Sequence, residues 1–283
     1  MSDLRSRLAV NAHTKLSDID PRSTPGLPDL RHDPKDWSAQ QVGEIGEQLA
    51  GYQERLFAAA KHETSKSRVL LVLQAMDCGG KDGTVRAIAR GMNPAGLSAV
   101  GFGPPTAEER SHDFLWRIRR ALPAPGMVGI FNRSHYEDVL VVRVHELVPE
   151  KEWSARYEQI NAFEKELAGD DLTMVKVMLH ISFQEQKERL ADRLDDPAKY
   201  WKYNPGDLDE RQRWDDYQRA YQDALTKCST AEAPWYVVPA DRKWYRNWAV
   251  ATLLQETFAE LDPQYPPADF DVNAERERLK SMP

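Results

Sequence analysis

The chain has 283 residues, of which 41% are hydrophobic and 29% are charged, so it can bury a core of ordinary size in one large or two small domains. Its formal net charge of −7 argues against a general nucleic-acid binder, because affinity for a phosphate backbone comes from cationic surface. The sequence contains no run of 18 apolar residues and no charged-then-apolar leader, so we expect a cytoplasmic protein with neither a membrane span nor an export signal.

Residues 1–36 are rich in proline, aspartate and serine, and we interpret them as an extended arm that lies on the body of the protein or on a neighbouring subunit. A helix is predicted over residues 38–62, because Ser38 begins a capping box and apolar residues follow on one helical stripe. We place the folded domain at residues 37–270 and a C-terminal tail at 271–283.

The next stretch has the order strand, glycine-rich turn, helix. Residues 69–73 are aliphatic without alternation, which is typical of a strand buried on both faces of a parallel sheet. The turn carries Gly79, Gly80 and Lys81, and apolar residues then recur at helical spacing. Glycines let successive backbone N–H groups point inward, the start of the helix adds partial positive charge, and Lys81 adds a full one. This pattern predicts a phosphate-binding loop.

The loop departs at two positions from the pattern G-x-x-x-x-G-K-[ST]: Ala75 replaces the first glycine, and Asp82 stands where a hydroxyl would bind Mg²⁺. Asp77 places a carboxylate inside a loop built for anions, where it would repel phosphate unless a divalent cation bridges the two. We therefore interpret Asp77 as a Mg²⁺ ligand. The alternative is an aspartate that stabilises a turn through its own backbone.

Two further strands are predicted over residues 98–102 and 127–131. A capping box that begins at Thr106 predicts a helix between them, and its apolar residues are Phe114, Leu115, Ile118 and Leu122. Polar residues crowd the chain just after the second of these strands. They include Asn132, Arg133, Glu137 and Asp138. Because ligands bind beyond the carboxyl ends of the strands in α/β sheets, we expect a binding site there.

The remaining chain continues the alternation of strands and helices. Helices are predicted over residues 150–167 and 241–261, and strands over residues 173–181 and 235–238. This order indicates an α/β fold with a mostly parallel sheet of about five strands, covered by helices on both faces.

The second informative region, residues 187–221, lies before the last strand. Arg189 and Arg193 share a helix face, Lys199 and Lys202 follow, and prolines and a glycine interrupt the pattern. A mobile basic segment of this kind closes over phosphates in P-loop kinases, and we name residues 187–221 the lid. The alternative is a surface helical hairpin in which nearby aspartates and glutamates neutralise every cation.

Four motifs, in this order, resemble the second polyphosphate kinase family, and the similarity extends from about residue 37 to 270. They read QAMDCGGKDGT, SHDFLWR, FNRSHYEDVL, and DDPAKYWK followed by WDDY. The segment SHYEDV resembles the subgroup, class III, that phosphorylates both AMP and ADP. One departure concerns Asn132, where relatives often have aspartate, so either Asn132, Glu137 or Asp138 is expected to join Asp77 at the metal.

The resemblance implies a thymidylate-kinase-like P-loop fold and a homo-oligomer, a dimer or a tetramer. It also implies an enzyme that uses Mg²⁺, with Mn²⁺ as a substitute, to move phosphoryl groups reversibly between inorganic polyphosphate and nucleotides, from AMP to ADP and from ADP to ATP. Two alternatives stay open at this point. One is an ATP-dependent kinase for a small molecule or a nucleotide, and the other is a nucleotide-binding switch, which would normally keep Ser or Thr after Lys81.

Phosphoryl transfer to an anionic acceptor needs positioning and charge neutralisation more than a strong base, and the residues divide accordingly. The predicted catalytic residues are Asp77, Lys81, Arg133, Asp138, Arg189 and Arg193. The predicted phosphate-binding residues are Gly79, Gly80, Lys81, Asp82, Gly83, Thr84, Lys199 and Lys202. The predicted nucleotide-binding residues are Arg117, Asn132, Arg133, Glu137 and Asp138.

Overall fold

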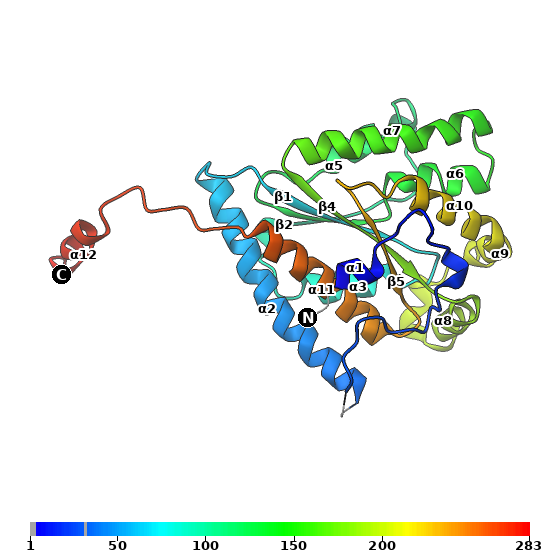
Figure 1. The fold of residues 1–283 in the computed structure, drawn as a ribbon, viewed down its shortest axis with the longest axis horizontal. Coiled ribbons are helices and arrows are strands. Elements are labelled where there is room, and N and C mark those ends of the chain that lie inside the picture. The colour runs from blue at the N-terminus through cyan, green and yellow to red at the C-terminus, as the bar shows by residue number, and fades with distance from the viewer. Residues whose placement is uncertain (1–3, 31–32) are drawn as a thin grey trace.

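The computed structural model describes residues 4–30 and 33–283 and is built around one five-stranded sheet (Figure 1). Its strands are β1 (Arg68–Gln74), β2 (Leu97–Gly101), β3 (Val128–Asn132), β4 (Leu172–His180) and β5 (Trp235–Pro239). They lie in the order β2-β3-β1-β4-β5, and every pair is parallel. The prediction of a parallel sheet of about five strands is confirmed.

Helices cover both faces of the sheet, which gives the three-layer α/β/α arrangement predicted from the sequence. Helices α2 (Pro34–Lys61), α3 (Lys81–Ala89) and α11 (Lys243–Leu261) lie on one side of the sheet, and α7 (Glu150–Gly169) lies on the other (Figure 1). The central strand β1 is buried almost throughout because it has helices on both faces. None of the helices in the described part of the chain is long and apolar enough to cross a membrane.

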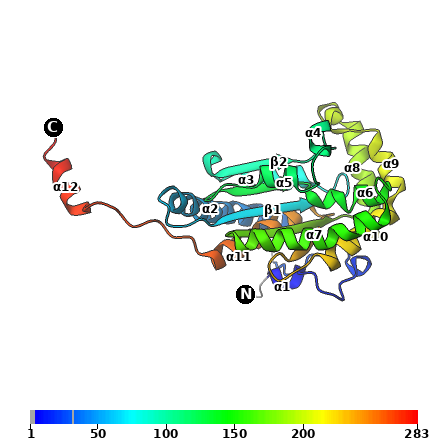
Figure 2. The same ribbon diagram turned by 90° about the horizontal axis from the view of Figure 1, so that it is seen from above.

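Several short helices lie between the main strands and helices or precede them in the chain. They are α1 (Leu4–Leu8), η1 (Leu16–Asp18), η2 (Pro94–Gly96), α4 (Ala107–Arg110), α5 (Trp116–Ala121), η3 (His135–Asp138) and α6 (Val141–Val144). The lid region is helical and consists of α8 (Phe183–Asp195), η4 (Pro197–Lys202), α9 (Gly206–Gln212) and α10 (Trp214–Lys227). Figure 2 shows α8, α9 and α10 gathered at one end of the molecule.

The first long helix does not begin where the sequence predicted. It begins at Pro34, with Asp33 as its N-cap, and the Ser38 hydroxyl donates instead to the backbone carbonyl of Trp244. The capping box at Ser38 was therefore wrong, because Asp33 followed by proline is a stronger helix start and Ser38 is buried against α11. Residues 34–36, expected in the arm, belong to this helix.

The helix predicted after Thr106 is broken in two. Thr106 and Glu109 form the predicted capping box, but α4 ends at Arg110. Asp113 then accepts a hydrogen bond from the backbone of Leu115, and α5 begins one residue later. The prediction of a single helix carrying all four apolar residues was wrong, because this aspartate turn separates the two short helices.

The two chain ends behave differently. The segment from α1 to residue 30 lies on the body, where Val10 donates to the Trp235 carbonyl and the Tyr245 hydroxyl donates to the Pro25 carbonyl. After α11 the chain extends away from the sheet to α12 (Val272–Lys280), as Figures 1 and 2 show.

Candidate active site

A cavity of about 540 Å³ lies beyond the carboxyl ends of β1 and β3, where the sequence predicted a site. Six of its lining residues are basic side chains that the sequence had singled out. They are Lys81, Arg133, Arg189, Arg193, Lys199 and Lys202. The glycine loop, Asp77, Asp82 and Asn132 also line it, so most of the predicted phosphate site converges on one space.

The loop after β1 has a backbone that requires its glycines. Gly80 has φ +101° and caps α3, and a methyl group at Gly79 would lie 2.4 Å from the Cβ of Ala75. Cys78 also adopts the left-handed region, with φ +61°. These conformations turn the chain sharply from strand to helix, so that the N-terminus of α3 faces the cavity. Thr84 is buried, and its hydroxyl donates to the Gly80 carbonyl.

Lys81 is folded back into the loop. Its Nζ donates to the Ala75 carbonyl over 2.9 Å, and the side chain is nearly buried. Burial and the nearby Arg133 lower the pKa of Lys81, while Asp77 opposes this shift. No carboxylate of the described residues forms an ion pair with Lys81, so its charge is suited to bind an anionic group.

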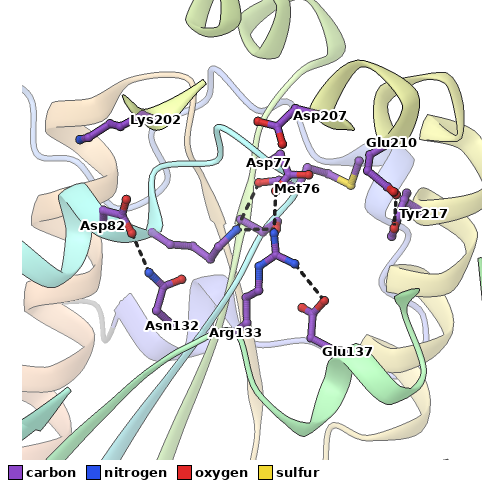
Figure 3. A network of polar contacts seen from close by, with 12 residues as sticks. Met76, Asp77, Asp82, Asn132, Arg133, Glu137, Lys202, Asp207, Glu210 and Tyr217 are labelled. Atoms are coloured by element: carbon purple, nitrogen blue, oxygen red, sulfur yellow. Dashed lines mark hydrogen bonds and ion pairs between the residues drawn. The ribbon is translucent and has the colours of Figure 1, made fainter. Parts of the chain in front are cut away.

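Asp77 and Arg133 are joined across the cavity floor (Figure 3). The Arg133 guanidinium donates to Oδ1 of Asp77 over 2.8 Å and to Glu137 over 3.3 Å. Glu137 and Asp77 raise the pKa of Arg133 against the opposing effect of burial. The three residues form a charged chain that holds the first residue after β3 against the loop after β1.

The predicted ligands of a divalent cation are Asp77 and one of three residues after β3, Asn132, Glu137 or Asp138. Within the described residues no group of three or more histidine, cysteine, aspartate or glutamate side chains has the spacing of a metal site. Asp77 nevertheless lines the cavity, and Oδ2 of its carboxylate has no hydrogen-bond partner among the described residues. A Mg²⁺ ion is typically held by one or two carboxylates together with waters and substrate phosphates, so Asp77 fits this role.

The three proposed companions of Asp77 lie differently. Asn132 donates from its amide to Oδ1 of Asp82 and lines the cavity (Figure 3). Glu137 is engaged by Arg133. Asp138 accepts from Arg156 over 3.0 Å, and burial raises its pKa to about 6 although Arg156 opposes the shift.

A buried polar cluster fixes the turn that follows Arg133. The Lys176 ammonium lies 2.5 Å from Glu164, which also contacts His135 and accepts from the Tyr136 hydroxyl. Burial raises the pKa of Glu164, but Lys176 and His135 outweigh burial, so this pKa is lowered and the carboxyl is ionised. The cluster joins β4, α7 and η3 beneath the site.

A second hollow of about 360 Å³ adjoins the main cavity and shares Gly101, Phe102 and Gly103 with it. Arg117 lines this hollow, donates to the Gly103 carbonyl and lies over the Phe102 ring. Trp116 lines it as well. An aromatic and arginine-lined hollow beside the phosphate loop suits a nucleoside, and binding a nucleotide stays a prediction for Arg117.

The four basic lid residues reach the cavity, but two of them also hold the fold. Arg189 donates to the Cys78 carbonyl over 2.9 Å and to the Ala240 carbonyl over 2.6 Å, so it ties α8 to the loop. Arg193 contacts Asp207. Lys199 pairs with an aspartate on its own turn, as the surface-hairpin alternative expects, and Lys202 lies over the Trp201 ring.

Sequence reasoning missed two basic residues of the cavity, Lys243 and Arg246, in the first turns of α11. Their spacing of three places both on one helix face just after the last strand. Basic residues directly after a strand are the sequence signal that could have predicted this part of the site. The apolar residues of α11 indicate a core helix instead.

Comparisons with known proteins agree with this geometry. The family model described as Polyphosphate kinase 2 (PPK2) matches residues 37–266. The chain is 49% identical over 245 residues to the AMP/ADP-polyphosphate phosphotransferase of Meiothermus ruber, covering 83% of this chain and 90% of that protein. It is 43% identical over 232 residues to the ADP-polyphosphate phosphotransferase of Rhodopseudomonas palustris, covering 78% of each.

A solved structure extends the likeness to the whole fold. The crystal structure of polyphosphate kinase 2 from Arthrobacter aurescens TC1 matches with a TM-score of 0.94 and 48% identity, covering 99% of this chain and 98% of that one. The glycine loop, the arginine after β3 and the basic lid thus occur together in a chain that belongs to the polyphosphate kinase 2 family.

Proposed function

We propose that the protein moves phosphoryl groups reversibly between inorganic polyphosphate and nucleotides, from AMP to ADP and from ADP to ATP. The observation that carries the proposal is a cavity in which Asp77 stands at a glycine loop among basic side chains from the loop after β3, the lid and α11. A polyanionic donor matches this excess of cations. The names of the two relatives support the same substrates.

The chemistry requires one bond to form and one to break. A terminal phosphate oxygen of the acceptor bonds to the end phosphorus of polyphosphate, the bridging P–O bond breaks, and the shortened chain leaves with the electron pair. Because the acceptor oxygen is already anionic near neutral pH, catalysis rests on alignment and charge neutralisation. Lys81 and the loop N–H groups hold phosphate oxygens, and Arg133 neutralises charge on the transferred group.

The two substrates approach from opposite sides of the loop. Arg117, Phe102 and Asn132 lie on the β2–β3 side and receive the acceptor nucleotide, while the lid cations lie over the donor. Asp77, with Asn132, Glu137 or Asp138 beside it, would hold Mg²⁺ or Mn²⁺. When bound there, the cation neutralises phosphate oxygens and orients them. We also propose that the protein is cytoplasmic and forms a homodimer or homotetramer. Light scattering of the purified protein tests the oligomeric state.

The experiment that tests this function offers polyphosphate as the only donor. With ADP, Mg²⁺ and polyphosphate, we expect ATP to form and polyphosphate to shorten. Turnover that occurs with ATP but not with polyphosphate as donor would establish the kinase alternative. Stoichiometric nucleotide binding without turnover would instead favour the switch.

A further inference from the structure

Arg246 occupies an unusual position beneath the phosphate loop. Its side chain is only 4% exposed, yet it lines the cavity. A methyl group at Gly80 would lie 1.8 Å from Nη1 of Arg246, and one at Gly83 would lie 3.0 Å from Nη2. The guanidinium therefore fits against the two glycines at the start of α3 and could not do so if either carried a side chain.

The charge of Arg246 is not neutralised within the described part of the chain. Its hydrogen bonds, from Nε and Nη2, go to the amide oxygen of Asn247, and no described carboxylate forms an ion pair with it. Burial and the neighbouring Arg189 lower the pKa of Arg246 to about 10, so it remains charged at neutral pH. A buried charge without a partner is costly, and an anion in the cavity would remove that cost.

The place of Arg246 in the fold indicates which anion it meets. Helix α11 follows β5, and β5 lies beyond β4 at the opposite edge of the sheet from β2. Lys243, one turn earlier on the same helix face, lines the cavity too. Among the described lining residues, the one aromatic side chain is Phe102, which lies after β2. The α11 side of the cavity thus offers cations and gives a nucleobase no ring to stack on.

We propose that Arg246 and Lys243 form a subsite for a donor phosphate beyond the one transferred, and that this subsite selects a polyphosphate chain over a nucleoside triphosphate as donor. The inference rests on the proposed function and deepens it. Arg246 reaches the donor through the fork of its guanidinium, and Lys243 adds a more exposed point charge. Both cations are carried by α11 rather than by the lid.

The test compares Arg246→Gln and Lys243→Gln with Arg242→Gln. The control removes the same charge from the same helix turn, and Arg242 is exposed and outside the cavity lining. For Arg246→Gln we expect kcat/KM for long polyphosphate to fall about 10- to 100-fold, as for loss of a charged hydrogen bond, with the KM for ADP within about twofold. Lys243→Gln should show a smaller fall of the same kind. Arg242→Gln should match the wild type.

A binding measurement separates this subsite from the proposed function. Tripolyphosphate, without nucleotide or metal, should raise the melting temperature of the wild type and of Arg242→Gln but raise that of Arg246→Gln much less. Equal stabilisation of all three, equal falls in kcat/KM with polyphosphate and with ATP as donor, or equal increases in the KM for polyphosphate and for ADP, would overturn the subsite. If Arg246→Gln fails to fold, Lys243→Gln decides by the same criteria. A wild type that binds tripolyphosphate but transfers nothing would refute the function and leave the subsite intact.

Discussion

The Arg133 guanidinium lies 2.8 Å from Oδ1 of Asp77 and links the first residue after β3 to the loop after β1. Arg133 has φ +66°, an uncommon conformation for a residue with a side chain, so the surrounding structure holds it in this orientation. The pair leaves Oδ2 of Asp77 without a described partner in the cavity. This ion pair thus joins the proposed metal ligand, Asp77, to the proposed phosphate ligand, Arg133.

Asp77→Asn should reduce turnover by ~10²-fold or more, because the amide can still accept from Arg133 but cannot supply the negative charge that the cation needs. Initial rates at saturating Mg²⁺ measure this. Asp215→Asn, an exposed change on α10, is the matched control and should keep full activity. Near wild-type rates for Asp77→Asn would mean that Asp77 only shapes a turn.

Neutralising Lys199 and Lys202 together should raise the KM for polyphosphate and weaken its dependence on salt, because two charges that face the polyanion are lost. The melting temperature should change little. The control replaces Arg219 and Lys227, exposed basic residues of α10 outside the cavity lining, with glutamine. The surface-hairpin alternative predicts the reverse, a small loss of stability with unchanged kinetics.

Glu164→Gln should destabilise the fold by about 3–5 kcal/mol, because it leaves the Lys176 ammonium buried without its carboxylate. Urea unfolding measures the change in the free energy of unfolding. The double change of Glu164→Leu and Lys176→Met removes both charges and should cost clearly less. If the double variant is the less stable of the two, the pair does not act as a buried charge couple.

His180 predicts a pH dependence of stability. Burial lowers its pKa to about 4, below the ordinary value of 6.5, although Asp241 and Asp20 oppose the shift. The folded protein therefore binds this proton less readily than the unfolded chain, and the contribution of His180, up to about 3 kcal/mol, is full above pH 6.5 and is lost as the pH falls toward 4. Unfolding curves at pH 7 and pH 4.5 measure it. His180→Gln should show a smaller loss between these values, and an equal loss would contradict the assignment.

Strand β1 was predictable because burial on both faces leaves a strong mark in the sequence. Residues 69–73 carry aliphatic side chains at every position, and β1 is buried accordingly. The starts of helices were less predictable. For α2 the sequence offers two candidate N-caps, Asp33 and Ser38. Ser38 had the spacing of a cap, but its hydroxyl found a partner on α11, which lies more than 200 residues away in the sequence.

Some residues of the site could likewise be predicted from the sequence and others could not. The glycine loop and Arg133 could be found because their residue types follow strands directly. Arg246 could not, since its function depends on which loop its helix packs against, and a helical pattern does not contain that information. Arg189 was predicted as a lid charge, and only the fold reveals that its guanidinium also holds the Cys78 and Ala240 carbonyls.

The most direct measurement of the central claim is a chromatographic time course with AMP, Mg²⁺ and polyphosphate and no added ATP. An enzyme that uses both acceptors must let either terminal phosphate reach the same in-line position. We expect ADP to appear first and ATP to follow after a lag as ADP accumulates. If AMP stays unchanged while ADP is converted to ATP, the acceptor site is selective for the diphosphate; if neither nucleotide reacts, polyphosphate is not the donor and the account is wrong.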